Sequence, residues 1–295
     1  MRVAVFGASG FIGREVVLNL AKSGHDVVKT IDATSGNPVN LLDLDMISRF
    51  LIDEAPEVII NCAGIVGNSD SAQQNPILTL NLLESITRSK LAVRRVIVSG
   101  SAAEYGLVKE SDLPVNESTA LNAYSLYGMS KLAETTQALA FGKLHEIPVV
   151  IARIFNPIGI GMSSKFLIPS LVHQINAIKS GERDAIDISR LDSRRDYIDV
   201  KDVANAMRLL AEGNPVEEVY NIGSGVATSN ATLIDMVVAH SGLSKTPTIL
   251  ESSLIPEELV AVQADITRMR GEFDWKPEFD LNNTVEDILN DTRRS

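Results

Sequence analysis

A tyrosine and a lysine four residues apart are the pair in this sequence best placed to do chemistry. Tyr127 and Lys131 lie near the start of residues 124–145, whose pattern predicts a helix, so that the two side chains share one face. An ammonium group beside a phenol stabilises the phenolate, which lets a tyrosine act as an acid or base near neutral pH. The spacing alone is common on surface helices, so this interpretation depends on the motifs that precede it.

A glycine-rich turn near the N-terminus could hold a dinucleotide. Gly7, Gly10 and Gly13 follow an apolar run at residues 2–6 and open an amphipathic stretch at residues 11–22. Glycines at such a turn let the backbone approach a pyrophosphate, whose charge is met by free N–H groups at the helix N-terminus. An ordinary glycine-rich turn between a strand and a helix is the alternative interpretation.

Asp32 bears on which dinucleotide is bound. It ends the predicted second strand, about 20 residues beyond the glycines, where a carboxylate accepts hydrogen bonds from the adenosine ribose and repels a 2′-phosphate. The sequence therefore favours NAD over NADP. Arg14 keeps NADP open, because a cation just after the third glycine could reach a phosphate, although it could equally be a solvated residue of the first helical turn.

The elements that must position these residues alternate through the first half of the chain. Short apolar runs and amphipathic stretches take turns, which predicts βαβ units and an α/β, doubly wound parallel Rossmann sheet. The predicted strands are residues 2–6, 26–31, 57–61, 94–99 and 148–153. The predicted helices between them are residues 11–22, 43–54, 76–90 and 124–145.

The alternation stops after Arg153, where an Asn-Pro pair and two glycines break it. We therefore expect an NAD(P)-binding Rossmann domain at residues 1–160 and a smaller C-terminal, mainly substrate-binding lobe at residues 161–295. Residues 196–225 are expected to return to the Rossmann domain. The elements predicted in this half are helices at residues 166–180 and 200–212 and a strand at residues 218–222.

Composition excludes several classes of protein. A net charge of −11 argues against nucleic-acid binding, which needs a basic surface. Cys62 is the single cysteine and permits no internal disulfide, while the four histidines lack the spacing of metal ligands, so no metal is expected. No window approaches about 18 uninterrupted apolar residues, so we expect no membrane span and a cytoplasmic protein.

Taken in order, these motifs resemble those of the extended short-chain dehydrogenase/reductase family, of the NAD-dependent epimerase/dehydratase type. The similarity covers nearly the whole chain and includes the glycine turn and the Tyr127–Lys131 pair. The other matching segments are residues 61–64, 99–106, 153–159, 195–200, 264–265 and 273–277. The resemblance implies an NAD(P)-dependent enzyme that moves hydride at a carbonyl or alcohol carbon.

The resemblance also implies a role for each residue of the catalytic set. Tyr127 would exchange the proton on the substrate oxygen, Lys131 would hold the nicotinamide ribose and tune the tyrosine, and Ser101 would hydrogen-bond the same oxygen. The family often adds an asparagine from the preceding helix, for which Asn75 and Asn81 are both candidates.

Two sets of residues follow from this comparison. The cofactor site, for NAD or else NADP, comprises Gly7, Ser9, Gly10, Phe11, Ile12, Gly13, Asp32, Asn40, Leu41, Cys62, Ala63, Gly64, Ser99, Tyr127, Lys131 and Ile154. The substrate site comprises Ser101, Ala102, Tyr127, Asn156 and Arg195. Cys62 is interpreted as a packing residue of the cofactor strand, because its neighbours do not provide the electropositive setting of a reactive thiol.

The residues beside Ser101 narrow the reaction. Sugar dehydratases of the family carry acidic residues just after the catalytic serine or threonine, whereas this chain has Ala102 and Ala103, so dehydration is disfavoured. Reductases that also epimerise use a Cys/His pair, but Cys62 belongs to the cofactor strand. Simple ketoreduction or alcohol oxidation remains, or a nucleotide-sugar 4-epimerase cycle in which hydride leaves and returns. The stretch from Asn156 to Val203 resembles reductases of 4-keto-6-deoxy nucleotide sugars most, so the resemblance favours that reduction, with the 4-epimerase as the alternative.

Arg195 is the best candidate to bind a nucleotide diphosphate, because a guanidinium can bind phosphates bidentately. The alternative is a structural ion pair with Asp196 or Asp199. Asn156 could touch the substrate phosphate or simply form an Asn-Pro turn. Many relatives carry a second arginine where this chain has Ile255, so that either another cation replaces it or the substrate is not a diphosphate ester. The candidate replacements are Lys165, Arg268 and Arg270.

A non-catalytic NAD-binding sensor or scaffold is the hypothesis from a different class, against which the intact Ser101, Tyr127 and Lys131 set argues. The predicted helices at residues 76–90 and 124–145 have apolar faces suited to the four-helix dimer interface of the family. The resemblance therefore also implies a homodimer.

Overall fold

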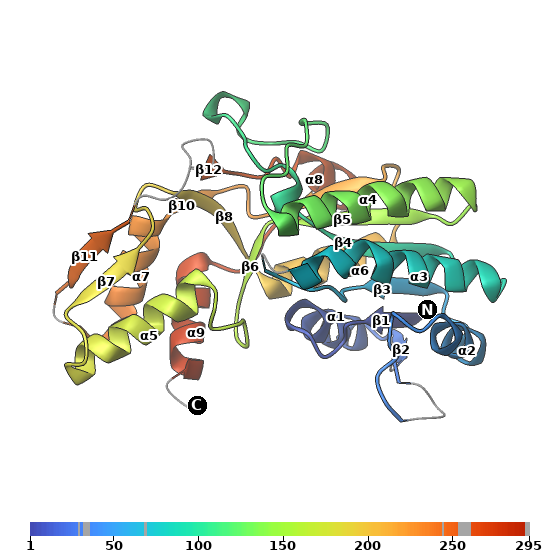
Figure 1. Cartoon of the computed structure of the whole chain (residues 1–295), viewed down its shortest axis with the longest axis horizontal. Helices are drawn as coiled ribbons and strands as arrows, with labels where there is room; N and C mark the ends of the chain where they lie inside the picture. Colours follow the sequence, from blue (N-terminus) through green and yellow to red (C-terminus); the bar gives the residue numbers. More distant parts are fainter. Residues whose placement is uncertain (29, 32–35, 68–69, 244, 253–260, 293–295) are drawn as a thin grey trace.

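The computed structural model describes residues 1–28, 30–31, 36–67, 70–243, 245–252 and 261–292. Asp32 and Ile255, which the sequence singled out, lie outside the described residues. The described chain forms a larger lobe around a parallel sheet and a smaller lobe that begins near β6 (Figure 1). The predicted doubly wound α/β fold is confirmed.

The sheet of the larger lobe has six parallel strands in the order β2-β1-β3-β4-β5-β9. These strands are β1 (Arg2–Phe6), β2 (Asp26–Val28), β3 (Val58–Asn61), β4 (Arg95–Ser101), β5 (Val149–Ile154) and β9 (Val219–Ile222). The helices around the sheet are α1 (Phe11–Lys22), α2 (Leu44–Glu54), α3 (Asn75–Arg88), α4 (Leu126–Leu144) and α6 (Val200–Glu212). Strand order changes direction between β1 and β3, which is the switch point where open α/β sheets bind ligands.

Alternate residues of each strand face the two helical layers. Val3 and Val5 of β1 belong to an apolar cluster with residues of α1 and α6, whereas Ala4 and Phe6 belong to a second cluster with residues of α2 and α3. Both faces of the sheet are therefore buried, which explains why its strands read as continuous apolar runs rather than as alternating patterns. Trp275, near the C-terminus, is 1% exposed and closes the first cluster.

Side-chain caps determine where several helices begin. Asp43 accepts a hydrogen bond from the Met46 N–H at the start of α2, and Asp199 accepts one from the Lys201 N–H at the start of α6. Ser125 caps α4, so this helix begins at residue 126 rather than at the predicted residue 124. Capping carboxylates and hydroxyls satisfy the amide groups that the first helical turn leaves without a partner.

The smaller lobe has an apolar core of its own, formed mainly by helices packed on short strands. Its helices are α5 (Leu167–Ser180), α7 (Asn230–Ser241) and α9 (Leu281–Thr292). The short strands of the C-terminal half are β6 (Asn156–Ile158), β7 (Ala185–Ile188), β8 (Arg194–Asp199), β10 (Ala227–Ser229), β11 (Thr248–Glu251) and β12 (Ala261–Val262). Strand β9 pairs with β5, and α6 packs on α1, so part of the second half lies in the larger lobe. The boundary at residue 160 stays a prediction.

A buried carboxylate fastens the C-terminal segment to α6. Asp202 is 1% exposed, and its two oxygens accept hydrogen bonds from the backbone N–H groups of Glu278 at 2.9 Å and Phe279 at 3.1 Å. Burial raises the pKa of Asp202 from 3.8 to about 6, because desolvation outweighs these hydrogen bonds. The folded protein therefore holds this proton more tightly than the unfolded chain does.

This titration predicts a pH-dependent difference between wild type and Asp202→Asn. As pH rises from about 4 to above 6, the wild type should lose up to about 3 kcal/mol of stability that the variant, which has no titrating group there, does not lose. Thermal unfolding of both proteins across this range measures the difference in Tm, which should move in favour of the variant as pH rises. Parallel curves for the two proteins would contradict the assignment.

Candidate active site

The glycine turn packs directly against the end of β3. Gly7 has a φ of +74°, and a Cβ on it would lie 2.6 Å from the backbone nitrogen of Ala63. A Cβ on Gly13 would lie 2.1 Å from the Gly7 carbonyl oxygen. Gly10 caps α1 without any side-chain hydrogen bond to the first turn. An approachable, uncapped helix N-terminus of this kind suits a pyrophosphate, so these residues fit a dinucleotide.

The strand ends beside this turn carry small or neutral side chains. Ala63 donates its N–H to the Asn61 side chain at 3.1 Å. Desolvation raises the pKa of the Cys62 thiol to about 12, against the smaller lowering effects of neighbouring Ser99 and Lys131. Cys62 is therefore a neutral thiol at physiological pH rather than a nucleophilic thiolate. Cys62, Ser99 and Lys131 therefore lie close to one another at the C-terminal ends of β3 and β4.

Ser101 ends β4 and is held by a buried carboxylate. Its N–H donates to Glu104 Oε1 at 2.7 Å, and its hydroxyl oxygen accepts from the Ala103 N–H at 3.2 Å, which together form a capping box on the short helix η2 (Ala102–Glu104). Glu104 Oε2 in turn pairs with Arg153 of β5 at 3.0 Å, and both side chains are at most 2% exposed.

Tyr127 lies in the first turn of α4, and that turn packs on η2. A Cβ on Gly128 would lie 2.5 Å from the carbonyl oxygen of Ala103, so the backbones of the two segments touch. Tyr127 is half-buried, while Lys131, one turn further along, is 4% exposed. The structure thus brings the serine segment, the tyrosine and the lysine to the same end of the sheet as the glycine turn.

The two candidate asparagines lie in different places. Asn75 is 1% exposed, and its side chain bonds both backbone groups of Ile65 and donates to the Ser130 hydroxyl at 3.2 Å. Asn81 instead donates to the Leu41 carbonyl at 2.9 Å. Asn75 is therefore the asparagine that reaches α4 between the tyrosine and the lysine.

The remaining predicted cofactor residues differ in their exposure to solvent. Ser9, Asn40 and Gly64 are exposed, Phe11 and Ile12 are half-buried, and Leu41 and Ile154 are buried. The ring of Phe11 lies near Gly159, where a Cβ would be 3.7 Å away from it. The N-terminal helix therefore faces the loop that leads to the smaller lobe.

The predicted substrate residues on the smaller lobe are held by structural contacts. The Asn156 side chain donates to the Asp196 carbonyl at 2.9 Å, and the segment is a short strand rather than the Asn-Pro turn considered from the sequence. Arg195 donates to the Arg194 carbonyl at 2.9 Å, and burial lowers the pKa of its guanidinium. Asp196 and Asp199 use their carboxylates elsewhere: the first bonds residues 224, 225 and 264, and the second bonds residues 201 and 284.

Arg268, one of the replacement cations considered from the sequence, and Arg194, the neighbour of Arg195, both have acidic partners. The Arg268 side chain donates to the Val219 carbonyl at 2.6 Å and lies within 4 Å of Glu117 and Glu217. It therefore sits at the start of β9, away from the strand ends that carry Ser101. Arg194 pairs with Glu110.

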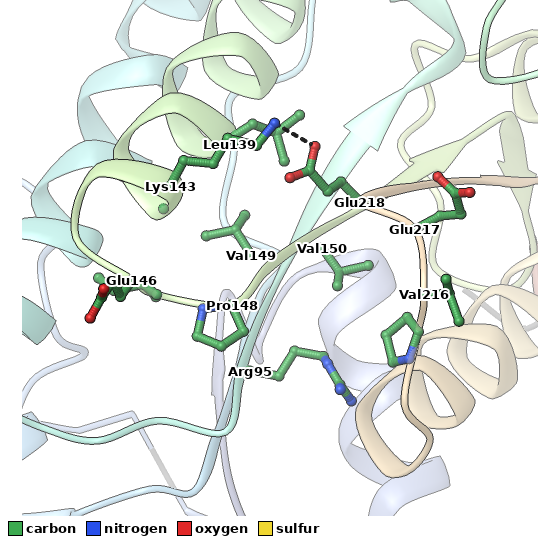
Figure 2. Close-up of a pocket in the computed structure, with 13 residues that line it drawn as sticks. Arg95, Leu139, Lys143, Glu146, Pro148, Val149, Val150, Val216, Glu217 and Glu218 are labelled. Carbon is green, nitrogen blue, oxygen red and sulfur yellow. Dashed lines mark ion pairs between the residues drawn. The ribbon is translucent and has the colours of Figure 1, made fainter.

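A pocket of about 320 Å³ opens at the opposite end of the sheet, among the N-terminal ends of β4, β5 and β9 (Figure 2). Arg95 lines it, but its guanidinium donates to the carbonyls of Leu210 at 2.9 Å and Gly213 at 2.6 Å at the end of α6. Lys143 and Glu218 pair with each other at 3.0 Å. Arg95, Lys143 and Glu218 of this pocket thus have structural partners.

Sequence reasoning missed the buried charges behind the site. Glu104 pairs with Arg153, and Glu134, three residues after Lys131, pairs with that lysine. The spacing of Glu134 from Lys131 on one helical face was the available signal.

Among the described residues, no group of three or more His, Cys, Asp and Glu side chains could hold a metal ion. None of the described helices has the length and apolar character needed to span a membrane.

With this geometry in place, comparison with known proteins defines the class. The NAD dependent epimerase/dehydratase family matches residues 3–223, and the chain belongs to this family. The family that the motifs predicted is confirmed.

Particular relatives are similar over nearly the whole chain. GDP-6-deoxy-D-mannose reductase of Pseudomonas aeruginosa is 29% identical over 299 residues, which cover 98% of this chain and 96% of the relative. UDP-glucose 4-epimerase GEPI48 of Cyamopsis tetragonoloba is 27% identical over 333 residues, with coverages of 98% and 94%. A solved structure of RMD from Pseudomonas aeruginosa complexed with NADPH has a TM-score of 0.89 at 27% identity and covers 99% of both chains.

The Glu104–Arg153 pair predicts a large loss of stability when one partner is removed. Arg153→Met leaves the Glu104 carboxylate buried without its countercharge and should lower the free energy of unfolding by about 3–5 kcal/mol. The double variant Glu104→Gln/Arg153→Met removes both charges and should be more stable than the single variant. Urea unfolding followed by circular dichroism measures both. A single variant as stable as the wild type would show that the pair does not hold this segment.

Proposed function

We propose that the chain is an NAD(P)-dependent oxidoreductase that reduces the 4-keto group of a nucleotide-activated deoxysugar. One observation carries this proposal: Ser101, Tyr127 and Lys131 converge on the strand ends that also carry the glycine turn. The relative named GDP-6-deoxy-D-mannose reductase, aligned over 98% of the chain, supports the substrate class.

Each residue of the set has a distinct task in this proposal. The Ser101 hydroxyl donates a hydrogen bond to the keto oxygen, and Tyr127 gives that oxygen its proton. Lys131 binds the nicotinamide ribose and favours the phenolate that is left. The bound cofactor, NADH or NADPH, supplies the hydride. The Glu104–Arg153 pair supports this arrangement, because Glu104 holds the Ser101 backbone N–H and is itself held by Arg153.

In this proposal the cofactor lies across the C-terminal ends of the strands, from the glycine turn after β1 to Ile154 at the end of β5. The adenosine half is held by Gly7, Ser9, Gly10, Phe11, Ile12, Gly13, Asp32, Asn40 and Leu41. The nicotinamide half is held by Cys62, Ala63, Gly64, Ser99, Tyr127, Lys131 and Ile154. The substrate site adds Ala102, Asn156 and Arg195, of which Arg195 binds the diphosphate through its guanidinium.

The position of Arg14 supports NAD over NADP. Its guanidinium donates to the Ile160 carbonyl at 2.8 Å and lies 3.4 Å from the Glu15 carboxylate, so it is already engaged by the loop that leads to the smaller lobe. Repulsion of a 2′-phosphate by Asp32 favours the same choice.

We therefore expect a higher kcat/KM with NADH than with NADPH. Replacing Arg14 by alanine should leave the ratio of the two values unchanged, because the guanidinium does not bind the 2′-phosphate. Steady-state rates with each reduced cofactor at saturating keto sugar give the ratio. Preference for NADPH that disappears in Arg14→Ala would reverse the assignment.

A nucleotide-sugar 4-epimerase is the second candidate, favoured by the similarity to a UDP-glucose 4-epimerase at 27% identity. Such an enzyme uses the same catalytic residues but keeps NAD tightly bound, because hydride leaves and returns. A non-catalytic NAD-binding sensor or scaffold is the candidate from another class, and it would not need a tyrosine and a lysine at the strand ends.

Purified protein incubated with NADH and a panel of GDP- and dTDP-linked 4-keto-6-deoxy sugars separates these candidates. Reduction consumes NADH in proportion to the product, whereas epimerisation interconverts isomers with no net loss of NADH. Tyr127→Phe removes the proton donor and should lower kcat by about 10²- to 10⁴-fold. A wild type no more active than this variant would favour the sensor or scaffold.

Two further properties belong to the same proposal. We propose a homodimer formed through α3 and α4, which is supported by the exposed apolar side chains of Ile77, Leu126 and Met129 on these helices. We also propose a cytoplasmic location, since the lone cysteine needs no oxidising compartment. A monomeric mass in solution would exclude the dimer.

A further inference from the structure

A buried carboxylate lies directly behind the lysine of the candidate site. Glu134 follows Lys131 by three residues on α4, and its side chain is 1% exposed. Its Oε2 accepts a hydrogen bond from Lys131 Nζ, and its Oε1 accepts one from the Thr79 hydroxyl of α3 at 2.5 Å. One oxygen of the carboxylate is therefore used to anchor it, and the other holds the ammonium group.

Buried polar side chains connect Glu134 to the end of β3, beside the proposed cofactor site. Thr79 accepts a hydrogen bond from Asn61 Nδ2 at 2.9 Å, and Asn61 Oδ1 accepts one from the Ala63 N–H at 3.1 Å. Asn61, Thr79 and Glu134 are each at most 1% exposed. The lysine ammonium is thus tied through Glu134 to the backbone at the end of β3, against which the glycine turn packs.

We propose that Glu134 is a positioning residue for the reaction: it keeps the Lys131 ammonium charged and directed at Tyr127 and the nicotinamide ribose, and it thereby sets the pH range in which the site works. The inference rests on the proposed function, which gives Lys131 its role. An ammonium group has three N–H donors. Glu134 accepts from one of them, which leaves two that can point toward the Tyr127 hydroxyl and the ribose. The lysine side chain is therefore ordered before the cofactor binds.

The charges around Lys131 support this assignment. Lys131 interacts electrostatically with Glu134 and Tyr127 from α4, with Glu104 from η2 and with Cys62 from the end of β3. Burial alone would lower the pKa of Lys131, but the neighbouring charges, that of Glu134 foremost, outweigh it and raise the pKa. Without the carboxylate, burial is opposed less, so the ammonium loses its proton at a lower pH.

The replacement Glu134→Gln tests the proposal, because it keeps the size of the side chain and removes its charge. We expect kcat for keto-sugar reduction to fall about tenfold or more at the optimum. We also expect the alkaline limb of the kcat–pH profile to move to lower pH by about one unit or more. A purely structural role would lower kcat or stability but would leave the position of this limb unchanged, and that result would overturn the proposal.

Two matched variants complete the experiment. Glu134→Asp keeps the charge on a shorter side chain, so kcat should fall while the alkaline limb stays near that of the wild type. Glu212→Gln makes the same chemical change on α6, where the carboxylate pairs with His25 and Arg208, and it should leave the profile unchanged. A limb that moves equally in Glu134→Asp and Glu134→Gln would show that geometry rather than charge is responsible, which contradicts the proposal.

A binding measurement keeps this inference separate from the proposed reaction. The dissociation constant for NADH, followed by nicotinamide fluorescence across the same pH range, needs no turnover. Binding should weaken at a lower pH in Glu134→Gln than in the wild type. Superimposable binding curves would overturn the role of Glu134 even in an active reductase. If no keto sugar is reduced by the wild type, the proposed function fails, while a shifted binding curve still supports Glu134 as the residue that holds Lys131.

Discussion

The contact between the turn after β1 and the end of β3 sets the geometry on which the rest of the site depends. Strand order reverses between these two strands, so their following connections leave opposite faces of the sheet and a crevice opens at their C-terminal ends. Gly7 allows the two backbones to approach closely there, because any Cβ on it would lie 2.6 Å from the Ala63 nitrogen. Ala63 also bonds Asn61, whose side chain begins the buried path to Lys131.

Two buried carboxylates hold the reactive segments on either side of this crevice. Glu104 directs one oxygen to the Ser101 N–H and the other to Arg153, while Glu134 directs one to Lys131 and the other to Thr79. Each carboxylate thus joins a residue of the site to a rigid element of the core. Such buried, fully bonded groups fix side chains more firmly than surface contacts do, because leaving any partner unbonded is costly in a low dielectric.

The fold was predictable from the sequence because its strands are buried on both faces and read as apolar runs, and because the glycine turn and the Tyr127–Lys131 spacing are local signals. The long-range pairs behind the site, Thr79–Glu134 and Glu104–Arg153, were not predictable in this way. Thr79 and Glu134 are 55 residues apart, and Glu104 and Arg153 are 49 residues apart, so only the tertiary packing brings them together. The short strand β6 was missed for a related reason: its pairing with β8 outweighs the local turn tendency of Asn-Pro.

The buried carboxylates also bear on the choice among the reactions of this family. Elimination of water from a sugar needs an extra acid and base beside the catalytic hydroxyl, where this chain has Ala102 and Ala103. The next carboxylate along the chain is Glu104, which is fully buried and already bonded to the Ser101 N–H and to Arg153. Glu134 lies behind Lys131 and is bonded on both oxygens. Both carboxylates are therefore already engaged in structural hydrogen bonds, so neither is placed as the additional acid or base that dehydration requires.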